Sequence, residues 1–165
     1  MMQQIHLHPH EVQAITRGRQ IHLLRPFSPQ PPATAQSWLL AADDTHDVKF
    51  FKNVIPNAVG MAVSGWLRQP IGRPGAVFMG LGPSAAIRLA VTAVTVRRVQ
   101  HMSFNEWLRD FAVTWHDERM ARASFTGAEY QVTYSRWFWD ALYPEFTWDS
   151  NPWIVDTQVE RVKHG

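Results

Sequence analysis

Apolar residues recur along the chain with the two spacings that distinguish strands from helices. The run IRLAVTAVTVRRV at 87–99 is rich in β-branched residues and apolar on both faces, which predicts a central strand of a barrel or covered sheet. Shorter strands are predicted at 5–8 (IHLH), 20–24 (QIHLL), 76–79 (AVFM) and 152–162 (PWIVDTQVERV). Strands are thus expected from one end of the chain to the other.

Capping signals in the C-terminal half predict two helices. Ser103 and Glu106 have the spacing of a capping box, and apolar residues then recur at i, i+3, i+4 and i+7, so a helix is expected at 103–111. A second capping box at 126–129 begins another helix, which ends before Pro144.

The N-terminal part combines a short helix with a long segment of no clear period. Pro9 is placed to open a helix and Gly18 to close it, so residues 9–17 are expected to be helical. Residues from about 27 to 70 are expected to form an irregular insertion on the rim of the domain. Strands separated by helices without a βαβ rhythm indicate one α+β domain over 1–165, with a small curved β-barrel flanked by helices.

Composition is that of a soluble globular protein. Of the 165 residues, 45% are hydrophobic and 18% are charged, which excludes a disordered chain. There is no apolar run of transmembrane length, and MMQQIHLHPH lacks the apolar core of a signal peptide, so a cytoplasmic protein without membrane contact is expected. The absence of Cys excludes disulfides, thiolate metal ligands and a Cys nucleophile.

Basic side chains gather in two places, although the net charge is only +2. That charge is too small for a protein that depends mainly on phosphate contacts, but it allows a local basic patch. On a strand, Arg19 and Arg25 share one face, while Gln20 and His22 share the other and are suited to read a base. The candidate ligand-binding residues are Arg19, Gln20, His22, Arg25, Arg97 and Arg98, with Trp66 and Trp153 as stacking candidates.

Plainer interpretations of the same residues stay open. The basic strand also fits a polar barrel rim, and Trp153 fits a structural role at the start of the last strand. His6 and His8 alternate on one strand face and, with His22, offer nitrogen ligands for Zn²⁺. No metal-binding spacing accompanies them, so no metal and no cofactor are predicted.

The order of these elements and the C-terminal motifs resemble the ASCH domain family, which has a PUA-like β-barrel fold. The most specific residues are Trp139-Asp140, Trp148-Asp149 and Asn151-Pro152-Trp153-Ile154-Val155. Within the family, the chain is most similar to small proteins carried by phages and prophages. The resemblance covers the chain apart from residues 37–70.

The resemblance implies a catalytic segment of the type Gly-x-Lys-Thr-x-Thr-x-Arg, which this chain matches only at its ends. Gly18 and Arg25 are retained, but Gln20 replaces the Lys, and Ile21 and Leu23 replace the Thr residues. Family members that hydrolyse acylated cytidine use the Lys, a Thr and a later Glu from an Arg-Glu-Thr segment, where this chain has Gly-Leu-Gly-Pro at 80–83. Gln has no amine to act as base or nucleophile.

Three hypotheses follow from these residues. The first is a non-catalytic ASCH/PUA-like domain that binds RNA or a modified nucleotide. The second is a phage-encoded protein that binds and inhibits a host or defence protein through the insertion at 37–70 and its acidic loop at 43–47. The third is an amidohydrolase or nuclease whose candidates are Gln20, His22, Arg25 and Glu129.

The replacement of the family's Lys by Gln20 predicts that purified protein does not turn over N4-acetylcytidine. Release of cytidine, followed by chromatography, is the measurement. Steady turnover by the wild type that is lost in the Gln20→Ala variant would contradict the prediction.

Overall fold

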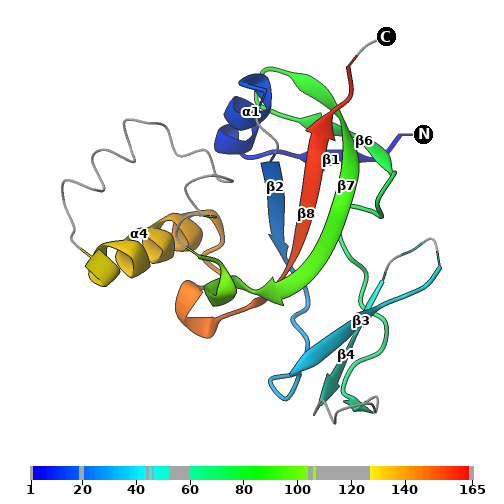
Figure 1. The fold of residues 1–165 in the computed structure, drawn as a ribbon, viewed down its shortest axis with the longest axis vertical. Helices are drawn as coiled ribbons and strands as arrows, with labels where there is room; N and C mark the ends of the chain where they lie inside the picture. The colour runs from blue at the N-terminus through cyan, green and yellow to red at the C-terminus, as the bar shows by residue number, and fades with distance from the viewer. Residues whose placement is uncertain are drawn as a thin grey trace.

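A five-stranded sheet forms the main body of the protein, and a three-stranded sheet lies at one end of it (Figure 1). The computed structural model describes residues 2–18, 21–43, 45, 47–52, 60–103, 106 and 127–163. Two helices accompany the strands in this described part of the chain. The α+β class predicted from the sequence is therefore confirmed.

The main sheet is mixed and has the long strand at its centre. In spatial order the strands are β1 (Gln4–His6), β6 (Val77–Leu81), β7 (Ala86–Arg98), β8 (Trp153–Arg161) and β2 (Ile21–Pro26). β1 is parallel to β6, and the other neighbours are antiparallel. β7 curves strongly along its length (Figure 1), and its register with β8 shifts between Val91 and Ala93. The central position predicted for this strand is confirmed.

The expected closure into a barrel is wrong, because the described strands form open sheets. β1 and β2 are the two edges of the main sheet and do not pair with each other. Side chains bridge these edges in place of a backbone ladder: Arg25 of β2 donates to the backbone oxygen of His6 at 3.1 Å. At the β2 edge, the Tyr143 hydroxyl also donates to the backbone oxygen of Leu24 at 2.7 Å.

The segment at 27–70 contains more regular structure than expected. Its strands β3 (Ser37–Leu40), β4 (Val48–Lys52) and β5 (Met61–Ala62) form an antiparallel sheet. The polar stretch between β3 and β4 is a hairpin connection, in which Asp43 accepts hydrogen bonds from the backbone and hydroxyl of Thr45. These strands are too short for the alternation of apolar and polar residues to be recognised in the sequence, so they are identified only by their pairing in the structure.

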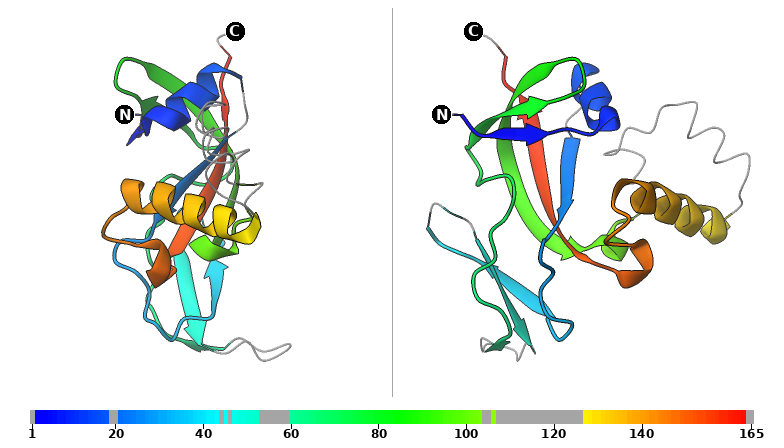
Figure 2. Two further views of the ribbon diagram at one scale, coloured as in Figure 1. Left: turned by 90° about the vertical axis from the view of Figure 1, so that its left-hand side faces the viewer. Right: turned by 180° about the vertical axis from the view of Figure 1, so that it is seen from behind.

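Both described helices lie where capping signals predict them. α1 (Pro9–Thr16) begins at Pro9 and is followed by Gly18 with φ 74°, and α4 (Gly127–Leu142) ends before Pro144. Figure 2 shows α4 to one side of the main sheet. Of the helix predicted at 103–111, the structure describes Ser103 and Glu106, which form the capping box, and the backbone of Glu106 is helical. The other residues of this predicted helix lie outside the described residues. Short 3-10 turns, η1 (Val99–His101) and η2 (Trp148–Ser150), adjoin β7 and β8.

Buried apolar residues form three clusters, each associated with a different part of the main sheet. One includes residues of α1 and the adjacent strands, among them Ile15, Leu23 and Leu89. The second joins Leu24 and Ile154 to Trp139 and Trp148. The third fills the space between the two sheets with Phe27, Phe50, Val96, Trp153 and Val155.

The capping box at Ser103 predicts a measurable contribution to stability. The backbone of Ser103 donates to Glu106 Oε2 at 2.7 Å, and the backbone of Glu106 donates to Ser103 Oγ at 3.2 Å. Ser103→Ala removes the second bond and should lower the free energy of unfolding by about 1 kcal/mol in urea titrations. Ser84→Ala, at an exposed turn, is the control and should change it by less than about 0.5 kcal/mol. Equal effects of the two variants would contradict the role of the cap.

Candidate functional site

The side chains of the two arginines at the end of β7 lie on opposite faces of the sheet. Successive strand residues point to opposite faces, and the register pairs Arg97 with Ile154 and Arg98 with Trp153. Arg97 therefore shares a face with Asp156, and Arg98 shares the other with Trp153. The sequence groups Arg97 and Arg98 as one basic cluster, and the pleat separates them.

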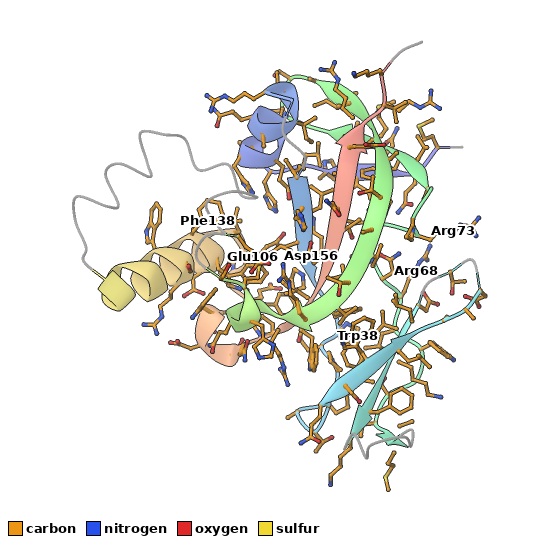
Figure 3. The ribbon with its side chains drawn as sticks, viewed as in Figure 1. Trp38, Arg68, Arg73, Glu106, Phe138 and Asp156 are labelled. Atoms are coloured by element: carbon orange, nitrogen blue, oxygen red, sulfur yellow. The ribbon has the colours of Figure 1, made fainter. Side chains whose placement is uncertain are left out.

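Asp156 is the centre of the polar cluster on the Arg97 face. Its side chain is 2% exposed, and its Oδ1 lies 2.7 Å from Nδ1 of His22 while its Oδ2 accepts from Arg97. Arg97 also pairs with Oε1 of Glu106 at 2.9 Å. Figure 3 shows Asp156 and Glu106 between α4 and the sheet. Burial raises the pKa of Glu106, but hydrogen bonds from Ser103 and Arg97 lower it to about 2.

This cluster orients an imidazole against a buried carboxylate. Such a pair holds a histidine ring in one orientation and stabilises its protonated form, which is the arrangement used in acid–base catalysis. A catalytic site also needs a nucleophile or a substrate position within reach of the ring. The described contacts around His22 are ion pairs and a capping hydroxyl, so what the cluster defines is an oriented histidine.

Arg25 forms a bidentate ion pair with Glu11 of α1. The two guanidinium nitrogens lie 2.6 Å and 2.8 Å from the carboxylate oxygens, and the Glu11 side chain is 2% exposed. Arg25 also donates to the backbone oxygen of Leu24 and to the Tyr143 hydroxyl. Burial raises the pKa of Glu11, but Arg25 outweighs burial and holds that pKa below its usual value. The guanidinium of Arg25, a candidate ligand-binding group in the sequence, is therefore engaged within the protein.

Two histidines pack against this ion pair. His8 lies 3.0 Å from the Tyr143 hydroxyl, and its ring stacks on that of His10 with centroids 5.6 Å apart. His10 meets the edge of Phe138 at 5.1 Å, and burial lowers its pKa to about 4. His8 contacts Tyr143 whereas His22 contacts Asp156, so these two histidines have different partners. Across the described residues, no group of three or more metal-ligating side chains is arranged to hold an ion.

Arg98 occupies a different environment, at the wall of an open cavity of about 700 Å³. Its guanidinium lies 4.5 Å from the centre of the Trp153 ring and donates to the backbone oxygens of Asn151 and Ala35. Within the described part of the chain, Arg98 has no carboxylate partner. Burial lowers its pKa from the usual value. Other lining residues are Gln30, Gln36, His101, Ser150 and Asn151.

Trp153 is buried beneath the Arg98 guanidinium. Its side chain is 6% exposed, and its ring packs against Phe50 at 5.1 Å while Arg98 covers one ring face. Gln30 fixes the adjoining loop, because its side chain accepts from the backbone nitrogen of Trp153 and donates to the backbone oxygen. The indole is therefore a support for Arg98, and a base has no access to the ring face that Arg98 covers.

Three predicted site residues remain. Arg19 and Gln20 are outside the described residues. Trp66 is 49% exposed, with the Lys49 ammonium 5.6 Å from its ring centre. The structure thus places Arg98 over Trp153, and it links His22 to Arg97 through Asp156. It also assigns roles to Glu11, Tyr143 and Asp156, which are separated by up to 145 positions in the chain and carry no motif signal.

No protein-family model, characterised protein or solved structure matches this chain. Neither described helix is both long enough and apolar enough to cross a membrane. The interpretation of the site therefore depends on its own geometry.

The lowered pKa of His10 predicts a pH dependence of stability. Between pH 6.5 and about 4 the unfolded chain binds a proton at this position that the folded chain does not, so stability falls as the pH falls through this window. His10→Phe keeps the ring contacts and removes this contribution, which is about 3 kcal/mol at most. Urea unfolding from pH 7 to 4 should show a shallower decline for His10→Phe than for the wild type.

The exposed His6 supplies the matched control for this experiment. His6→Phe should retain the wild-type decline between pH 7 and 4, because His6 lies outside the buried cluster. Glu11 also loses its favourable contribution as the pH falls, but only below its usual pKa near 4.5. A wild-type decline in His10→Phe would contradict the assignment to His10.

Proposed function

We propose that this chain is a non-catalytic, phage- or prophage-type ASCH/PUA-like domain that binds RNA or a modified nucleotide at the Arg98 cavity. The observation that carries the proposal is a half-buried guanidinium, supported by Trp153, that lines a cavity and has no carboxylate partner among the described residues. The family resemblance of the sequence motifs supports the class. The proposed binding of RNA or a modified nucleotide depends on the cavity, because a fold does not determine a function.

Electrostatics favour an anion at this position. Partial burial of a cation removes hydration, and the cost is offset only by a compensating charge or by hydrogen bonds. Arg97 and Arg25 receive that compensation from buried acids, whereas within the described part of the chain Arg98 donates to two backbone oxygens and pairs with no acid. These bonds use fewer than all the N–H donors of a guanidinium, so donors are left for a phosphate.

The dimensions and lining of the cavity suit a nucleotide. Its volume of about 700 Å³ lies within the usual range for small-ligand clefts, roughly 300–1,000 Å³. Because the indole ring already has Arg98 on one face, a base would stack on the outer face of the guanidinium. Trp153 is then a positioning residue. His101 and Asn151 in the lining offer hydrogen bonds to base or sugar.

Several local features agree with the ASCH/PUA-like part of the proposal. Gly18 adopts a positive φ directly after α1, and Arg25 lies near the end of the next strand. Asn151 is in the left-handed region and leads into Trp153 at the start of β8, as its motif anticipates. The replacement of the family's Lys by Gln20 supports a binding role without catalysis.

A second candidate function is supported by the surface of the three-stranded sheet. Three large apolar side chains are exposed on or beside it: Leu39 by 52%, Met61 by 75% and Trp66 by 49%. By register, Leu39 lies opposite Lys49, whose ammonium is 5.6 Å from the Trp66 ring centre, whereas Met61 lies opposite Lys52 on the other face of the sheet. Leu39 and Trp66 are therefore the apolar pair considered for a protein contact, because such contacts use contiguous apolar surface. This observation favours binding of a host or defence protein through the insertion, and it is independent of the Arg98 cavity.

Replacement of Arg98 tests the first proposal. Fluorescence anisotropy with short labelled RNA and DNA oligomers should show that Arg98→Ala weakens RNA binding about tenfold and lowers the salt slope by about one unit. Arg98→Lys should give an intermediate affinity, because it keeps the charge and loses the planar stacking surface. Arg88→Ala, at an exposed position of the same strand, is the matched control and should bind as the wild type does.

Two results would count against this proposal. One is no RNA binding by the wild type below about 100 μM at low salt, where non-specific binders register. The other is equal binding by Arg98→Ala and Arg88→Ala. The protein-partner function would then take first place, with a pull-down comparing the wild type and a variant of the acidic loop at 43–47.

A further inference from the structure

The first strand of the small sheet has an open outer edge. In the order β3–β4–β5, β3 pairs on one side only, and the small sheet lies at the end of the molecule away from β1 and α1 (Figure 1). Val48 of β4 exchanges both backbone hydrogen bonds with Leu67, at 2.8 and 2.7 Å, on the side away from β3. Its register partner Leu40 therefore directs its N–H and C=O away from β4, and Trp38, two residues earlier, does the same. Among the described residues, no backbone group bonds to this outer edge.

The other sheet edges in the described part of the chain are shorter or covered. β1 has three residues and β5 has two. At β2, Tyr143 and Arg25 both donate to the backbone oxygen of Leu24. The stretch at 37–42, SWLLAA, contains no charged residue and no proline, which are the residues that commonly block edge pairing. The edge of β3 can therefore pair with another strand.

The sequence of this edge is complementary to itself. When two copies of β3 pair antiparallel about a two-fold axis through Leu39, Trp38 of each copy lies opposite Leu40 of the other. These are the residues whose N–H and C=O face outwards, so each such pair exchanges two hydrogen bonds. Leu39 lies opposite its own counterpart at the non-hydrogen-bonded position, where side chains are closest. Its side chain, which is 52% exposed, is thereby covered by an identical one.

Charges do not oppose this pairing. Ser37 and Ala41 flank Leu39 on the same strand face, and the two-fold axis places each opposite the other. Lys49 of β4 is the register partner of Leu39 on the inner side. Three strand spacings, or about 14 Å, separate the two copies of Lys49 in the joined sheet, which exceeds the screening length of roughly 8 Å at physiological salt.

We propose that two copies of this chain associate through antiparallel pairing of their β3 strands, so that their three-stranded sheets form one continuous sheet. The open backbone groups of Trp38 and Leu40 and the exposed side chain of Leu39 carry the proposal. The inference goes beyond the proposed nucleotide site, because no residue of 37–42 lines the Arg98 cavity. The dimer also covers one member of the Leu39–Trp66 pair considered for a protein partner.

Analytical ultracentrifugation of the full chain over a concentration series tests this proposal. The series extends to about 200 μM, because small interfaces are commonly weak. The weight-average mass of the wild type should rise with concentration from 19.0 kDa, the mass of one chain, towards twice that value. Leu39→Lys should stay at the mass of one chain, because it places like charges opposite each other across the axis. Met61→Lys adds the same charge at the opposite edge of the small sheet, where Met61 is 75% exposed, and should associate as the wild type does.

A mixture of two variants tests the register. Leu39→Glu alone should stay at the mass of one chain for the same reason as Leu39→Lys. An equimolar mixture of the two should associate more strongly than either variant alone, because opposite charges then face each other across the axis. Circular dichroism confirms that each variant is folded.

Amide hydrogen exchange of the wild type gives a second measurement that needs no variant. The amides of Trp38 and Leu40 should become protected as the protein concentration rises, because they gain a partner only in the dimer. The Leu39 amide faces β4 and should be protected at every concentration.

Three outcomes would overturn the proposal. One is a wild type that keeps the mass of one chain throughout the series, which leaves Leu39 available to the protein partner of the second candidate function. Another is equal association of Leu39→Lys and the wild type, which assigns the dimer to a different surface. The third is a mixture of Leu39→Glu and Leu39→Lys that associates no better than either variant. The test of RNA binding with Arg98→Ala is independent of all three.

Discussion

The buried carboxylate of Asp156 is the constraint on which the arrangement of the sheet depends. A charge at 2% exposure is tolerated only when it is paired, and Asp156 is paired with His22 of β2 and Arg97 of β7. Because β8 lies between those two strands, one side chain connects all three. The same interaction holds Arg97 on one face of the sheet. The alternation of the strand then places Arg98 on the opposite face, over Trp153.

Several charged side chains form ion pairs inside the protein, so a partly buried charged side chain without such a partner is informative. Glu11 and Arg25 neutralise each other in a bidentate pair, and Arg97 is shared by two acids. Against this background, Arg98 lacks a carboxylate among the described residues. Arg98 lines a cavity, whereas the paired charges join elements of the fold. Charge compensation thus separates the residues that stabilise the structure from those proposed to bind ligands.

The insertion contributes to the proposed nucleotide site. Ala35 and Gln36, directly before β3, line the Arg98 cavity. Phe50 of the same sheet packs on Trp153 and supports the indole from the small-sheet side. The segment that forms the three-stranded sheet therefore lines part of the Arg98 cavity, and it is also a candidate surface for a protein partner.

Local signals in the sequence determined the elements with strong periods or caps. The long apolar strand, α1 between Pro9 and Gly18, the box of Ser103 and Glu106 and the end of α4 before Pro144 were all predictable, because each depends on residues within a few positions. Tertiary structure alone decided that the sheet stays open, that β3, β4 and β5 form a second sheet, and that Arg25 meets Glu11. It also decided the separation of Arg97 from Arg98, since strand register and burial bring together residues such as His22 and Asp156, which lie 134 positions apart.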